Sequence, residues 1–227
     1  LQAAIFDALN VPFWVSVMIT ILLIWIYTFQ GGIKTIVWTD TLQTFFMLAT
    51  VIVVIVLITK DMGIGLGEAI DQIKASELST TFNFEWGSTR FFTKQFISGA
   101  LIAIVMTGLD QDMMQKNLTC KTLKDAQKNV FWFSVVLIFA NILFLSLGVL
   151  LYLFAADKGI IVPERSDLLF PTIALEHLGT TAGVVFLLGI IAAAYSSADS
   201  ALTALTTSFC VDFLNFDEKT EEKKKKT

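Results

Sequence analysis

Long apolar segments dominate this sequence and leave few folds open to it. A helix needs about 20 consecutive apolar residues to cross the hydrocarbon core of a bilayer. Five segments of the 227-residue chain meet that length: about 11–30, 36–59, 95–114, 130–155 and 181–211. Charged residues make up only 16% of the chain, against about 25% in soluble domains. We therefore predict an all-α, polytopic membrane bundle with five transmembrane helices in a lipid bilayer.

The same composition argues against several classes of function. The chain has a net charge of −4 and no general basic surface for phosphates, so no nucleic-acid partner is expected. Cys120 and Cys210 are too few for a disulfide scaffold and are expected to pack. The only histidine, His177, lacks partners at zinc-ligand spacing. Because no phosphate loop or nucleophile elbow occurs either, we expect no enzyme activity.

The segments between the apolar runs predict two short helices outside the membrane. Residues 66–78 place apolar side chains at near-helical spacing, which is typical of an amphipathic surface helix. In the second long loop, Pro171 is expected to open a short helix that runs to His177 and stops at Gly179.

Lysines predict how the chain is oriented in the membrane. One lies in the short turn at 31–35, and others cluster in the loop at 115–129 and in the tail at 217–227. Short basic loops face the cytoplasm, whereas long loops carry little weight. We therefore expect the N-terminus outside the cell and the C-terminus, with its lysine-rich tail, in the cytoplasm. A solvated tail is favoured over one bound to anionic lipid.

An acidic residue interrupts the second apolar segment near its start. Asp40 lies about one turn into that segment, and an acid within a span is a candidate functional residue because it is costly there. It could serve an ion site, or it could only stabilise a helix N-terminus, which is worth about 0.3–1 kcal/mol. Position alone leaves both interpretations open.

The fifth apolar segment carries a polar stripe. Ser196, Ser200, Thr203 and Thr207 follow helical spacing, so their hydroxyls share one face, and Asp199 flanks that face. Close helix packing explains the small residues but does not explain a carboxylate among them. Hydroxyl, carboxylate and carbonyl oxygens suit a hard cation such as Na⁺. We favour an ion pathway over packing.

The third apolar segment ends in a polar cluster. Asp110, Gln111 and Asp112 lie at that end, where pairing at an inner gate or extension toward the interface is favoured over ion binding. Gly99 and Gly108 interrupt the same segment, which is a weak sign of the broken helices that transporters use.

Three stretches of the chain, in order, resemble the sodium:solute symporter family. They are residues 27–43 with the pattern YT…GG…WTD…Q, residues 108–116 with GLDQDMMQK, and residues 192–202 with AA…SSADS.L. The resemblance implies the inverted-repeat fold of the leucine transporter, with the five apolar segments as core helices four to eight. Core helices one to three, nine and ten would then be missing, so we expect a part of a longer protein.

The resemblance also implies that Na⁺ is the coupling ion. In the family, core helix eight offers one Na⁺ a backbone carbonyl and two hydroxyls, and the matching residues are Ala193, Ser196 and Ser197. Some members bind a second Na⁺, whose ligands match Asp40, Ser196, Asp199 and Ser200. Position 199 is an aspartate here, where the family has a hydroxyl.

Substrate contacts in the family come partly from core helix six. The matching residues are Ala103, Met106 and Thr107, and Ala103 lacks the polar side chain that sugar-binding members use. The resulting prediction is a Na⁺-coupled secondary transporter that imports a small organic solute by alternating access. The alternatives are a symporter-like membrane module of a sensor protein and an inactive truncated fragment.

Overall fold

Helices make up most of the described chain. The computed structural model describes residues 10–28 and 32–214, and these residues contain no β-strand. The predicted all-α class is confirmed, whereas the predicted tail at 217–227 lies outside the described residues. The α-helices are α1 (Phe13–Thr28), α2 (Gly32–Asp61), α3 (Leu66–Ala75), α4 (Phe92–Gly108), α5 (Gln111–Leu118), α6 (Leu123–Lys158), α7 (Leu169–Thr172) and α8 (Gly179–Ser208).

Three of the described helices are long and apolar enough to span a membrane. They are Thr35–Asp61 within α2, the whole of α6, and α8 with its extension to Phe213. The pair α4 and α5 qualifies as a fourth span, although the chain bends by 53° between them. Helix α1 is apolar but has only 16 residues, short of the usual span. The polytopic membrane bundle is confirmed, with three or four candidate spans among the described residues where five were predicted.

The predicted third span, 95–114, is broken rather than continuous. Helix α4 ends at Gly108, and α5 starts in a new direction two positions after Leu109. Asp110 explains the new start, because its carboxylate accepts the N–H of Met113 at 2.9 Å and so caps the first turn of α5.

Helix α6 begins earlier than predicted. It starts at Leu123 rather than near residue 130, because the Thr122 hydroxyl accepts the N–H of Asp125 at 3.2 Å and caps the helix. The first turns of α6 are polar, so an apolar run could not reveal them. The cap is the feature that marks the true start.

Both short helices predicted outside the spans are present. Helix α3 covers Leu66–Ala75 within the predicted 66–78. Helix α7 begins at Leu169, and a wider turn continues it to His177. Gly179 follows with a φ of +79°, a left-handed conformation that glycine adopts without strain, and α8 starts there.

Buried apolar side chains gather where α2, α6 and the turn after α7 meet. Val54, Ile58, Leu150, Phe154 and Ile173 are each at most 1% exposed. Lipid tails are as apolar as these side chains, so van der Waals packing, rather than release from water, holds such a cluster in a membrane. This cluster fixes α2 relative to α6.

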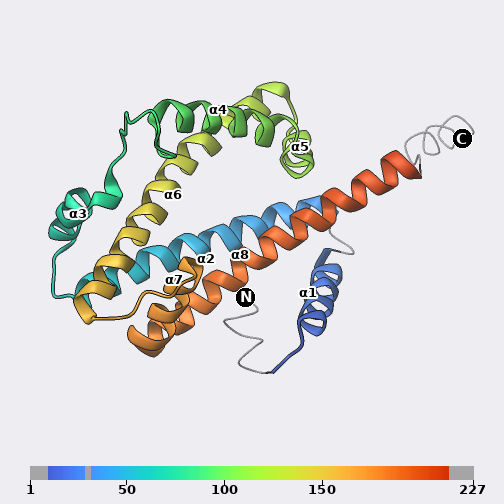
Figure 1. Cartoon of the computed structure of the whole chain (residues 1–227). Coiled ribbons are helices and arrows are strands. Elements are labelled where there is room, and N and C mark those ends of the chain that lie inside the picture. Colours follow the sequence, from blue (N-terminus) through green and yellow to red (C-terminus); the bar gives the residue numbers. More distant parts are fainter. Residues whose placement is uncertain (1–9, 29–31, 215–227) are drawn as a thin grey trace, which may run out of the picture.

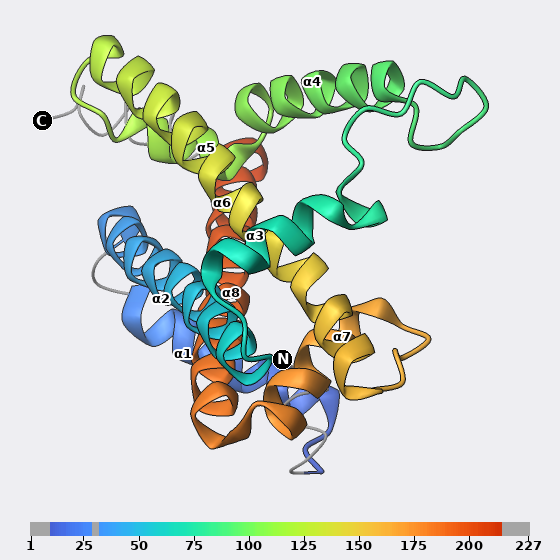
Figure 2. The same cartoon turned by 90° about the vertical axis from the view of Figure 1, so that its left-hand side faces the viewer.

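Helices α2 and α8 lie side by side over much of their length, as Figures 1 and 2 show from two directions. They are antiparallel and very close at Gly189, where an added Cβ would lie 2.5 Å from the Thr50 Oγ1. The Thr50 hydroxyl also donates to the Val185 carbonyl at 3.0 Å. From this contact α2 runs back to Asp40 as α8 runs on to Ser196, so the pairing aligns their polar residues.

Candidate cation site between α2, α5 and α8

The antiparallel packing of α2 and α8 brings Asp40 to the serine stripe. The Ser196 hydroxyl donates to Oδ1 of Asp40 at 2.8 Å. The second-site hypothesis requires this arrangement, because an Asp40 carboxylate that pointed to lipid could not share a ligand with α8. The structure thus brings two of the sequence-derived candidates into direct contact.

Lys116 supplies the positive charge of this cluster. Its ammonium lies 2.5 Å from Oδ2 of Asp40 and 2.7 Å from Oδ2 of Asp112, one turn away on α5. It also donates to the Ser200 hydroxyl at 3.0 Å. One ammonium therefore links α5 to both α2 and α8, at the position where the sequence predicted a Na⁺ ion.

The charged groups of this site are largely removed from solvent. The side chains of Asp40, Lys116 and Asp112 are 17%, 24% and 25% exposed. Exposed ion pairs contribute little to stability, whereas loss of one partner from a buried pair is costly. The Lys116 contacts lie between these limits, so solvent screens them only in part.

A cavity of about 790 Å³ adjoins the ion pairs. Its lining combines the charged cluster with hydroxyls and apolar side chains from several helices. The lining residues are Val37, Asp40, Thr41, Thr44, Thr107, Asp112, Met113, Lys116, Thr119, Cys120, Asn129, Val130, Phe133, Ser196, Ser197 and Ser200. Such a mixture can hold a solvated ion or a small polar solute.

The residues of the first predicted Na⁺ site lie on the same part of α8. The Ser197 hydroxyl donates to the Ala193 carbonyl at 3.1 Å, and Ser197 is exposed and lines the cavity. Ser196 uses its hydroxyl on Asp40 instead. The two adjacent serines therefore face different partners, and α8 alone contributes all three predicted ligands.

Asp199 bonds to a different helix from the one that Asp40 and Ser196 join. It is 0% exposed, and its Oδ2 accepts a hydrogen bond from the Tyr27 hydroxyl of α1 at 2.9 Å. Its Oδ1 is buried and has no hydrogen-bond partner among the described residues. Within the described chain Asp199 is thus turned toward α1, while Asp40 is bonded to Ser196 and Lys116.

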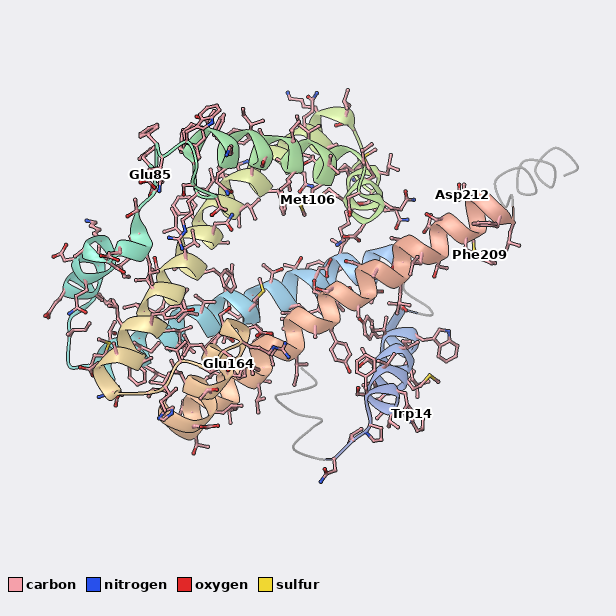
Figure 3. The ribbon with its side chains drawn as sticks, in the orientation of Figure 1. Trp14, Glu85, Met106, Glu164, Phe209 and Asp212 are labelled. Carbon is pink, nitrogen blue, oxygen red and sulfur yellow. The ribbon has the colours of Figure 1, made fainter. Side chains whose placement is uncertain are left out.

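Only some of the candidates from the third apolar segment lie at the cavity or in the ion-pair cluster. Thr107 lines the cavity, whereas Ala103 and Met106 are exposed on α4 and do not line it. Figure 3 labels Met106 on α4, above the α2–α8 pair, and Asp212 in the last turn beyond α8. Of the gate candidates, Asp112 pairs with Lys116, Asp110 caps α5 and Gln111 is exposed.

Two residues of the site were not among the sequence-derived candidates. Lys116 was counted only as a loop cation, although its spacing from Asp112 is typical of a helical ion pair. Tyr27 gave no comparable signal, because its partner Asp199 lies far away in the sequence. A local pattern can reveal the first kind of contact and cannot reveal the second.

The ligand chemistry of the cluster favours a hard cation. Among the described residues, no three His, Cys, Asp or Glu side chains gather as they do around a transition metal. Carboxylate and hydroxyl oxygens are what the site offers, and such oxygens bind hard cations. An alkali ion or an ammonium fits this set better than zinc does.

Comparisons with known proteins agree with this chemistry. The chain is 22% identical to the sodium/sialic acid symporter of Proteus mirabilis, covering 88% of this chain and 41% of that protein. It is 26% identical to the sodium-coupled monocarboxylate transporter 2 of Bos taurus, covering 88% and 34%. It is 24% identical to the sodium/iodide cotransporter of Homo sapiens, covering 88% and 32%.

The chain thus spans less than half the length of these relatives. No solved structure gives a significant match. The model of the sodium:solute symporter family matches residues 3–227, which include every helix and every site residue described above. This chain belongs to the sodium:solute symporter family.

Proposed function

We propose that the protein containing this chain is a Na⁺-coupled symporter that imports a small organic solute by alternating access. Family membership supports this proposal, and so does the position of Asp40 in a membrane-spanning helix. The contact between the Asp40 carboxylate and the Ser196 hydroxyl carries the argument. A carboxylate within a span is retained where it binds or conducts an ion.

Na⁺ is assigned to two places on α8 in this proposal. The first uses the Ala193 carbonyl with the Ser196 and Ser197 hydroxyls. The second uses Asp40, Ser196 and Ser200. Asp199 is left out of the second set, because it is bonded to Tyr27 in place of these residues.

At the second Na⁺ site, the Lys116 ammonium competes with Na⁺, which would not happen at a site made only of oxygen ligands. Its ammonium already contacts Asp40 and Ser200. A Na⁺ ion can enter only when the ammonium withdraws, because both cations need the same carboxylate. Binding of Na⁺ at Asp40 is therefore linked to the position of α5.

The solute is assigned to the cavity beside the cation site. Thr107, Ser197 and Asn129 give that cavity neutral polar groups, while Ala103 and Met106 would border the solute only after α4 moves toward α8. Asp110, Gln111 and Asp112 are proposed to form the inner gate, with the Asp112–Lys116 ion pair closing it. The remaining helices of the parent protein would complete the solute site.

The lysine distribution supports a topology for this symporter. We place the start of the chain outside the cell and its C-terminal end in the cytoplasm, because the short segments at 31–35 and 115–129, which connect the predicted spans, carry lysines and no more than one acid. The inner gate then faces the cytoplasm, as import requires.

Uptake by the full-length protein in lipid vesicles tests this function. Radioactive sialic acid, a short monocarboxylate and iodide serve as solutes, since the relatives named above are transporters of these. We expect uptake of at least one solute under an inward Na⁺ gradient and none with choline. The variant Ser196→Ala with Ser197→Ala should abolish Na⁺ dependence.

Thr206→Ala is the matched control for that variant. The Thr206 hydroxyl is on α8 but bonds only within its own helix, to the Leu202 carbonyl at 2.7 Å. We expect the control to transport normally. Na⁺-dependent uptake that survives the double serine variant would refute the first-site assignment.

A further inference from the structure

Aromatic side chains gather where the segment that follows α3 joins the start of α4, away from the cation site. We call this group the aromatic strip, and its members are Phe82, Phe84, Trp86, Phe92 and Phe96. Its rings pack in pairs, with centroids 5.0 Å apart for Phe82 and Phe92 and 6.0 Å apart for Phe92 and Phe96. Figure 3 labels Glu85 in this segment, away from the α2–α8 pair. The proposed Na⁺ and solute sites do not use the strip.

Two polar contacts hold the strip against the first turn of α4. The Phe92 N–H, at the start of the helix, donates to the Asn83 carbonyl at 2.8 Å. The Lys94 ammonium donates to the Trp86 carbonyl at 3.2 Å and lies 5.9 Å from the centre of the Trp86 ring, within the range of a cation–π contact. The strip is therefore a folded feature at one end of α4.

Most rings of the strip are exposed in spite of this order. Phe82, Phe84 and Phe96 are 62%, 69% and 66% exposed, and Trp86 is 77% exposed. A contiguous apolar patch with polar residues around it marks a contact with a membrane or with another protein. The strip therefore needs a partner that covers its rings.

The length of α4 places the strip at the edge of a bilayer. Helices α4 and α5 together form the bent fourth candidate span. Helix α4 has 17 residues, and a rise of about 1.5 Å per residue makes it about 25 Å long. The hydrocarbon core is about 30 Å thick, so the start of α4 lies close to the boundary between hydrocarbon and headgroups. Tryptophan is enriched at this level of a membrane.

The charges beside the strip decide between a lipid cover and a protein cover. Glu85, Arg90 and Lys94 are all exposed, and none of them forms an ion pair with another described residue. An apolar helix packed over the strip would take these unpaired charges out of water, which is costly. A headgroup layer keeps them solvated and offers phosphate groups to the two cations, whose long stems can lie along the rings.

We propose that the aromatic strip docks this segment in the interfacial layer of the phospholipid bilayer, on the side of the membrane where α4 begins. The rings lie where the acyl chains meet the headgroups, and Arg90 and Lys94 face lipid phosphate. This contact anchors the first turn of α4, the helix whose last turns reach the cavity through Thr107. It is a lipid-binding surface, which goes beyond the proposed transport of Na⁺ and solute.

Fluorescence quenching of Trp86 in lipid vesicles tests the proposal. The full-length native protein and Trp86→Phe are placed in phosphatidylcholine vesicles, and the difference between their emission spectra isolates Trp86. Bromine atoms on the acyl chains, near either the headgroup or the chain end, quench from the lipid, and acrylamide quenches from water. We expect the strongest loss of Trp86 emission with bromine near the headgroup, a smaller loss with bromine near the chain end, and little loss with acrylamide.

Glu164→Trp, made together with Trp86→Phe, is the control. Glu164 is exposed in the loop between α6 and α7, so acrylamide should quench the added emission and brominated lipid should not. No Na⁺ or solute is present, so the result is independent of the proposed transport. Strong quenching of Trp86 by acrylamide would show that the strip lies in water, and no quenching by any of the agents would show that protein covers it. Either result would overturn the proposal.

Discussion

Replacement of Lys116 by methionine is expected to increase the affinity of the protein for Na⁺. Methionine keeps an unbranched side chain of similar reach but removes the ammonium that contacts Asp40 and Ser200. In the native protein, Na⁺ must displace that ammonium before it can reach the Asp40 carboxylate. The variant leaves Asp40 with an open coordination position and no competing cation.

The size of the effect follows from the contacts that the ammonium makes. A hydrogen bond to a charged group is worth about 1.5–3 kcal/mol. The Asp40 and Lys116 side chains are 17% and 24% exposed, so solvent screens the pair only in part. If one such contact must be broken for Na⁺ to bind, its removal should strengthen Na⁺ binding by about 10- to 150-fold.

Thermal unfolding of the purified full-length protein measures this affinity without a known solute. Samples in NaCl and in choline chloride at equal ionic strength are compared over a range of Na⁺ concentrations. Stabilisation grows with ligand concentration relative to the dissociation constant. We expect the rise in Tm of Lys116→Met to appear at about one tenth or less of the Na⁺ concentration that the native protein needs.

Lys116→Arg is the control, because it keeps a positive charge beside Asp40 and Asp112. It should retain a Na⁺ dependence close to that of the native protein. Equal Na⁺ dependence in the methionine variant and in the native protein would refute the idea that the ammonium and Na⁺ exclude each other. A lower Na⁺ affinity in the methionine variant would show that Lys116 helps to build the Na⁺ site.

Two further predictions concern the helices that position the site. Gly189→Ala should destabilise the protein by about 1–3 kcal/mol, because its new Cβ would overlap the facing helix. Gly148→Ala is the control and should not destabilise the protein, because its new Cβ meets nothing within 4 Å. Thermal unfolding measures the stability of both variants. Asp110→Ala should remove the N-cap of α5 at a cost of about 1 kcal/mol. Hydrogen exchange at the Met113 amide should then become about fivefold faster, and an unchanged rate would argue against the cap.

The sequence could predict the parts of this fold that depend on long or local patterns. Apolar runs located α2, α6 and α8, because a membrane span must be long and apolar throughout. The break at Leu109 and the early start of α6 depend on single capping residues, Asp110 and Thr122. Such caps add one hydrogen bond each, so they change helix ends without changing the hydropathy of the segment.

In the candidate site, too, the sequence predicted the features that depend on local patterns and not those that depend on tertiary packing. Helical spacing placed Ser196 and Ser200 on one face, and the cost of an acid in a span marked Asp40. Only the family resemblance indicated that α2 and α8 share a site, where the Ser196 hydroxyl contacts Asp40. The pairing of Tyr27 with Asp199 does not follow, because it depends on how α1 packs against α8. That packing is a tertiary contact, and no local sequence pattern indicates it.

A count of formal charges gives a reason for the proposed Na⁺ site to bind a cation from solution. In the described part of the bundle interior, the carboxylates of Asp40 and Asp112 contact a single ammonium, that of Lys116. Lys116 bridges these two carboxylates, so the cluster keeps an excess of one negative charge. Because excess negative charge is costly in a membrane, the cluster must recruit positive charge from solution. In the proposed symporter, Na⁺ at Asp40 supplies that charge.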